Sequence, residues 1–141
     1  MNRHVGWAVV AVAAGLSFGA PASAETVKMK AALSGTQQVP PVAGTAVGTL
    51  DASYDTATKA LTWTGTYSGL TGPATAAHFH GPAEVGANAG VAVPAPAPAS
   101  PFQGTATLTD AQATALVDGK MYFNIHTAAH PGGEIRGQVI R

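Results

Sequence analysis

The chain has 141 residues, with seven basic and seven acidic side chains and no cysteine. Its length suits one domain, and a balanced 10% of charged residues excludes the basic surface that nucleic-acid binding requires. The lack of cysteine excludes disulfides, thiolate metal sites and thiol catalysis.

Residues 1–24 have the features of a secretory signal peptide. Arg3 supplies a positive charge, an apolar run covers 5–20, and Ala22-Ser23-Ala24 fits the small-x-small cleavage rule. A membrane anchor is the alternative, but about sixteen apolar residues are short for a span. We therefore expect a mature domain of residues 25–141 that is periplasmic or secreted and has no membrane contact after cleavage.

Seven segments alternate apolar and polar residues or are rich in β-branched residues, which predicts β-strands. In chain order they cover residues 26–34, 45–54, 59–67, 74–80, 102–108, 120–127 and 134–140. The turn at 55–58 joins the second and third segments into a hairpin. Thr109 is a helix N-cap, and the spacing of the apolar residues after it predicts a helix over 110–117 that Gly119 ends.

Two segments are predicted to be irregular. Residues 83–90 form a small polar loop, and the Ala/Pro-rich run 91–101 is expected to be a polyproline-II excursion on the surface, with a proline-motif ligand as the alternative. The predicted class is all-β, an antiparallel Greek-key-like sandwich or barrel with one short helix. Aromatic residues are 6% of the chain, so we expect a core built largely from Val, Leu, Ile and Ala.

Four of the five histidines lie in or just after two predicted strands. Side chains alternate along a strand, so His78 and His80 point to one face, about 7 Å apart, and Phe79 points to the other. His126 lies on a later strand that can bring a third imidazole to the same face. His130 follows in a turn and is the fourth, weaker candidate. This pattern predicts one bound metal ion.

The chemistry of these ligands favours particular metals. Imidazoles without a thiolate suit Cu(II), Zn(II) or Ni(II), and the affinity order favours copper, with zinc as the alternative. In the competing interpretation, His78 and His80 are structural and hydrogen-bond loop carbonyls beside Gly81-Pro82. No phosphate-binding loop, serine triad or carboxylate dyad is arranged for catalysis, so no catalytic residue is assigned and a non-enzymatic role is favoured.

Further polar residues lie on the same strands as the histidines. Asn124 and Tyr122 share a face with His126, and either would orient a ligand, because metal-bound imidazoles usually donate their other N–H to an oxygen. Glu134 and Arg136 share a face of the last strand. They are predicted to form an exposed structural ion pair across the hairpin.

Four motifs occur in series: Gln-Val-Pro-Pro at 38–41, Ala-Ala-His-Phe-His-Gly-Pro at 76–82, Tyr-Phe-Asn-Ile-His-Thr at 122–127 and Pro-Gly-Gly-Glu-Ile-Arg-Gly-Gln at 131–138. In this order and spacing they resemble the chordin-type domain family (CHRD). The resemblance implies a stand-alone bacterial secreted β-domain; in animals, repeats of the domain occur in an extracellular antagonist of bone morphogenetic proteins. The chain differs from the family pattern at His130, where Asn or a small residue is common, and in the Ala/Pro run after Val91.

Three functions are consistent with these features. The first is an exported protein that binds a divalent transition metal through the histidines. The second is an extracellular protein-interaction or adhesion domain, as the resemblance to the animal proteins implies, whose partner is another protein. The third is a small metalloenzyme that resembles copper–zinc superoxide dismutase, which would need further ligands, a bridging histidine and an aspartate.

Overall fold

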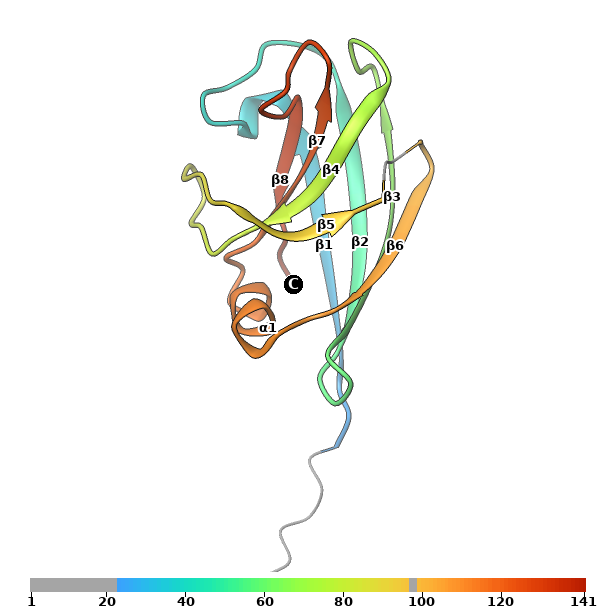
Figure 1. Ribbon diagram of the computed structural model, residues 1–141, viewed down its shortest axis with the longest axis vertical. Coiled ribbons are helices and arrows are strands. Elements are labelled where there is room, and N and C mark those ends of the chain that lie inside the picture. Colours follow the sequence, from blue (N-terminus) through green and yellow to red (C-terminus); the bar gives the residue numbers. More distant parts are fainter. Residues whose placement is uncertain (1–22, 97–98) are drawn as a thin grey trace, which may run out of the picture.

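The computed structural model describes residues 23–96 and 99–141, so the predicted signal peptide lies almost entirely outside the described residues. In the described part of the chain, eight strands form one antiparallel sheet in the order β5-β4-β7-β8-β1-β2-β3-β6 (Figure 1). The elements are β1 (Thr26–Ser34), a 3-10 turn (Gly35–Gln37), β2 (Val47–Asp55), β3 (Ala60–Ser68), β4 (Ala74–His80), β5 (Val91–Ala95), β6 (Phe102–Thr107), α1 (Asp110–Val117), β7 (Tyr122–Thr127) and β8 (Ile135–Gln138).

The sheet coils on itself into a nearly closed barrel. Trp63 of β3 and Phe79 of β4 are far apart in the strand order, yet their rings meet edge to face inside the barrel, with centroids 5.0 Å apart. The two ends of the order, β5 and β6, also approach each other (Figure 1). The predicted class is thus confirmed, in its barrel form.

The strands follow the predicted alternation of faces. β1 buries every second residue, and its full length pairs with β2. The hairpin of β2 and β3 is confirmed, and its turn is fixed by Asp55, whose Oδ1 accepts hydrogen bonds from the backbone N–H groups of Ala57 (2.9 Å) and Thr58 (2.8 Å). The limits of these predicted strands differ from the observed ones by at most two residues, which is the usual uncertainty at the ends of such elements.

The barrel interior is more aromatic than the composition suggested. Trp63, Phe79, Phe102 and Phe123 are all buried, and Phe123 contacts both Phe79 and Phe102. Glycine provides room for this cluster, because a Cβ at Gly104 would lie 2.2 Å from the Trp63 ring. The expectation of a core built largely from Val, Leu, Ile and Ala is confirmed, because most of the buried hydrophobic residues are of these types. The few large rings among them fill more volume than their number implies.

The single predicted helix is confirmed over Asp110–Val117. Thr109 caps it: its hydroxyl accepts from Gln112 N (3.2 Å), and the Gln112 side chain accepts from Thr109 N (2.8 Å). This reciprocal pair satisfies two backbone donors that the first turn leaves free. Gly119 follows with a φ of +70°, a left-handed conformation that glycine adopts without steric cost.

The prediction for residues 91–101 was wrong in its first half. Val91–Ala95 forms strand β5, which pairs with β4 and includes the register pair His78↔Pro94. Proline is tolerated there because β5 lies at the end of the strand order, where one edge makes no ladder bonds. Residues 97–98 lie outside the described residues. The strand thus forms one margin of the sheet that carries the histidines.

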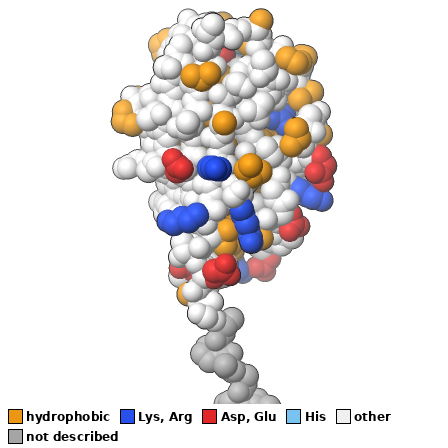
Figure 2. All heavy atoms as spheres, turned by 180° about the vertical axis from the view of Figure 1, so that it is seen from behind, with side chains coloured by type: hydrophobic (Ala, Val, Ile, Leu, Met, Phe, Trp, Pro, Cys, Tyr) orange, Lys and Arg blue, Asp and Glu red, His pale blue; other side chains and the backbone are white. Residues whose placement is uncertain are grey.

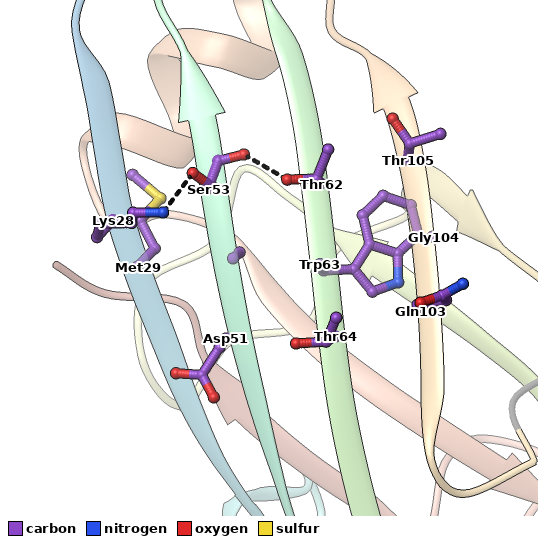
Figure 3. A pocket seen from close by; sticks show the side chains of 11 residues that line it. Lys28, Met29, Asp51, Ser53, Thr62, Trp63, Thr64, Gln103, Gly104 and Thr105 are labelled. Carbon is purple, nitrogen blue, oxygen red and sulfur yellow. Dashed lines mark hydrogen bonds between the residues drawn. The ribbon is translucent and has the colours of Figure 1, made fainter.

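The outer face of β1, β2, β3 and β6 is polar. Seen from behind, charged side chains of both signs are interspersed and apolar ones lie in separate small groups (Figure 2). An open hollow of about 780 Å³ crosses this face (Figure 3), and its polar side chains partly bond to one another, as Lys28 Nζ does to Ser53 Oγ (3.1 Å). No histidine lines this hollow, so it is separate from the predicted metal site.

Candidate metal centre

Neighbouring strands β4 and β7 bring the three predicted ligands together. Their antiparallel register pairs Ala76 with His126, His78 with Asn124 and His80 with Tyr122. All three imidazoles therefore lie on the outer face of the sheet. The residues between them on these strands, Ala77, Phe79, Phe123 and Ile125, are fully buried in the core. The predicted alternation of faces is confirmed on both strands.

The imidazoles form a compact cluster. One ring nitrogen from each of His78, His80 and His126 lies within 4.8 Å of the others. The closest approach joins His78 Nδ1 to His126 Nε2 at 3.1 Å. His80 and His126 are buried, each with 9% of its surface exposed, whereas His78 is partly exposed. One side of the cluster is therefore open to an incoming ion.

Backbone carbonyls fix which nitrogen of two histidines carries a proton. His80 Nδ1 lies 2.9 Å from Ala89 O, and His126 Nδ1 lies 2.8 Å from Pro131 O. A carbonyl accepts but does not donate, so each Nδ1 bears hydrogen and, in the neutral ring, each Nε2 bears a lone pair. This is the arrangement by which proteins orient imidazoles towards a metal ion.

The lone pairs of both rings are directed to one place. Asn124 Oδ1 lies 3.0 Å from His80 Nε2 and 2.9 Å from His126 Nε2. With both rings neutral, three acceptors therefore face one another, and His78 Nδ1 lies beside them. Converging acceptors need a cation or donors, which an N–H at His78 Nδ1 or an exchange of the two ends of the Asn124 amide would supply.

The electrostatics keep two of the rings neutral. Burial, and then the nearby His126 and His80, lower the pKa of His78 below its ordinary value of 6.5. Burial also lowers the pKa of His80; contacts with Ala89 and Asn124 oppose this, and the charges of His126 and Arg136 add to it. Neutral imidazole is the form that binds metal.

The imidazole of His80 stacks on the Tyr122 ring, which in turn contacts the Arg136 guanidinium. The Tyr122 ring lies parallel to that of His80, with 1° between planes and 4.8 Å between centroids. The Arg136 guanidinium carbon lies 3.4 Å from the centre of the Tyr122 ring. The Tyr122 hydroxyl also donates to Ala89 O (3.2 Å), the carbonyl that holds His80. Tyr122 thus positions His80 by stacking and by holding its hydrogen-bond partner.

The predicted ion pair between Glu134 and Arg136 is absent, and neither side chain is exposed. Arg136 donates to Asn88 Oδ1 (3.0 Å) and Ala87 O (2.6 Å) in the loop before β5. Glu134 instead accepts from Thr71 and Thr127. The prediction failed because β8 begins only at Ile135, so Glu134 lies in the turn before it and does not follow the strand alternation.

His130 does not join the cluster. It lies in the turn between β7 and β8, where its backbone bonds to Thr127 and Gly133. Among the described residues, His78, His80 and His126 form the group that could hold a metal ion, and His130 is not part of it. The turn still serves the site, because it presents the Pro131 carbonyl to His126.

Sequence reasoning missed part of the surroundings of the site. Gly133 has a φ of +116°, and a Cβ there would lie 2.5 Å from Gln38 Nε2 and 2.8 Å from Asn124 Nδ2. Gln38 is buried, and its Nε2 has no hydrogen-bond partner. The motifs at 38–41 and 131–138 marked both segments, but no periodicity indicated that they meet at Asn124.

Comparison with known proteins gives one family. No curated protein and no solved structure showed significant similarity to the chain. No helix in the described residues is long and apolar enough to cross a membrane. The model of the CHRD domain matches residues 29–139. This range contains all three clustered histidines and every strand of the barrel, except for the start of β1. The chain therefore belongs to the CHRD domain family.

Proposed function

We propose that this domain binds one divalent transition metal ion through His78, His80 and His126, with copper favoured and zinc as the alternative. The observation that supports this most directly is the convergence of His80 Nε2 and His126 Nε2, both with Nδ1 facing a backbone carbonyl, beside His78 Nδ1. Asn124 Oδ1 lies within 3.0 Å of both Nε2 atoms and offers a fourth, oxygen donor.

The donor set favours copper. Three neutral nitrogens and an amide oxygen contain no carboxylate, and the general affinity order places copper above zinc for nitrogen ligands. The site is also supported from behind by the carbonyls of Ala89 and Pro131. Such supporting bonds commonly raise metal affinity by about 10- to 100-fold.

A structural role for the histidines is the competing function, and one observation favours it. His80 and His126 each have protein partners at both ring nitrogens, so they can be satisfied without an ion if the Asn124 amide donates. The domain would then act through a protein partner. An enzyme like copper–zinc superoxide dismutase would need a second set of ligands, and the described residues provide a single cluster of three histidines.

Calorimetric titration with Cu(II) and Zn(II) tests this proposal. The wild type is expected to bind one equivalent, and His78→Ala, His80→Ala and His126→Ala are each expected to weaken binding at least tenfold. His130→Ala is the matched control and should weaken it less. Each variant is first checked for folding by circular dichroism. Absence of uptake by the folded wild type at micromolar metal would refute metal binding and leave the interaction domain.

We further propose that the protein is exported and cleaved before Glu25. The support is the signal-like segment of residues 1–24, together with membership of the CHRD family. Intact-mass measurement of protein recovered from the cell envelope or medium tests this. A mass that includes residues 1–24 would contradict it.

A further inference from the structure

Arg136 places a buried positive charge directly behind the histidine cluster. β7 lies between β4 and β8 (Figure 1), so the Tyr122 ring is held between His80 on one side and Arg136 on the other. Arg136 is 2% exposed, and water therefore screens its charge poorly. Any ion bound at His80 would lie within the field of this guanidinium.

Among the described residues, no acidic side chain forms an ion pair with Arg136. The two partners of Arg136 are a neutral amide and a backbone carbonyl, from Asn88 and Ala87. The ion pairs in the described residues are Lys59–Asp110 and Lys120–Glu84, both at the surface. The nearest acid along the chain, Glu134, is bonded to threonines. A buried cation without a carboxylate is costly, so its position beside the cluster needs an explanation.

We propose that Arg136 makes the histidine site discriminate by ion charge, so that it lowers the affinity for divalent ions relative to the monovalent cuprous ion. This inference rests on the proposed function and extends it to Cu(I) as a second ion that the same site binds. The three ligands are neutral, and Arg136 contacts Tyr122, whose ring stacks on His80, so its charge acts on an ion bound there. A divalent ion is repelled by it twice as strongly as a monovalent one.

The expected size follows from the geometry. The guanidinium carbon lies 3.4 Å from the centre of the Tyr122 ring, which lies 4.8 Å from the centre of the His80 ring. An ion bound at Nε2, in the plane of the His80 ring, would therefore lie roughly 9–10 Å from the guanidinium. With an effective dielectric constant near 20, one additional unit of charge at that distance changes the binding constant by about tenfold.

Two variants remove this field by different means. Arg136→Gln removes the charge and keeps donors for Asn88 and Ala87. Asn88→Asp leaves Arg136 in place and puts a carboxylate where the amide oxygen now lies, 3.0 Å from Nη1. Asn88 is exposed, so this variant decides the question if Arg136→Gln does not fold. Lys28→Met, on the opposite polar face, is the control that removes one remote exposed charge.

The experiment measures Cu(I) and Zn(II) affinity for each protein by anaerobic competition with chromophoric chelators. Both Arg136→Gln and Asn88→Asp are expected to raise the affinity for Zn(II) relative to Cu(I) by about tenfold, and Lys28→Met to leave the ratio within about twofold. If the wild type binds both ions and the affinity ratio is unchanged in the folded site variants, the role of Arg136 is refuted, but the proposed metal binding is not. A wild type that binds neither ion would overturn the proposed function itself.

Discussion

Replacing Glu134 by Gln tests whether a buried carboxylate stabilises the turn beside the histidine cluster. Glu134 is 3% exposed. Its carboxylate accepts from Thr71 N (2.9 Å), Thr71 Oγ1 (2.7 Å) and Thr127 Oγ1 (2.6 Å). These bonds join the loop after β3 to the end of β7 and to the turn that presents Pro131 to His126.

The magnitude follows from the three bonds. A hydrogen bond to a charged group contributes about 1.5–3 kcal/mol, against about 0.5–1.5 kcal/mol for a neutral one. The substitution therefore removes about 3 kcal/mol of stabilising free energy from the three hydrogen bonds. Because burying a neutral amide costs less than burying a carboxylate, part of this loss is offset. We expect a net loss of about 2 kcal/mol in the free energy of unfolding at pH 7.

The pH dependence gives a second signature. Burial acts to raise the pKa of Glu134, but hydrogen bonds from Thr127 and Thr71 outweigh it and hold this pKa below its ordinary value of 4.5. The folded state therefore binds the proton less readily than the unfolded state. The stabilisation is complete above pH 4.5 and is lost as pH falls through the lowered folded value. The difference between wild type and variant should shrink over that range.

Urea unfolding of both proteins at pH 7 and at successively lower pH measures these effects. Glu84→Gln is the matched control, because Glu84 forms a surface pair with Lys120 and its side chain is 75% exposed; its loss should be below about 1 kcal/mol. The reasoning is refuted if Glu134→Gln costs no more than Glu84→Gln at pH 7. It is also refuted if the cost persists unchanged in acid.

Three further predictions concern the clustered histidines, the core and the helix. The pKa values of His78 and His80 are lowered from 6.5, so these residues bind fewer protons in the folded state than in the unfolded state. The free energy of unfolding should therefore decrease as pH drops below about 6.5, and His80→Gln should make this pH dependence weaker in denaturant titrations. Gly104→Val should destabilise the barrel by at least about 2 kcal/mol in thermal unfolding, because the new Cβ would overlap the Trp63 ring, and an unchanged melting temperature would contradict that packing. Thr109→Ala should cost about 1 kcal/mol through loss of the cap, whereas Thr109→Ser, which keeps the hydroxyl, should cost much less by the same measurement.

The sequence by itself determined what depends on local periodicity. Alternation along two strands placed His78, His80 and His126 on one face and Phe79 on the other, and the structure confirms it. The capped helix over Asp110–Val117 was also predictable, because capping and helix termination involve neighbours in the chain. Family membership followed from motifs in series.

Only the tertiary structure decided what depends on contacts between distant segments. The carbonyls of Ala89 and Pro131, which orient the imidazoles, come from loops that carry no periodic signal. Val91–Ala95 became a strand because β4 offered it an edge, against the local preference of an Ala/Pro run. Arg136 and Glu134 share a stretch of sequence but not a partner, since each buried charge bonds to the loop that covers it. Residue type and spacing determine which kinds of interaction a side chain can make, and long-range packing determines which groups it contacts.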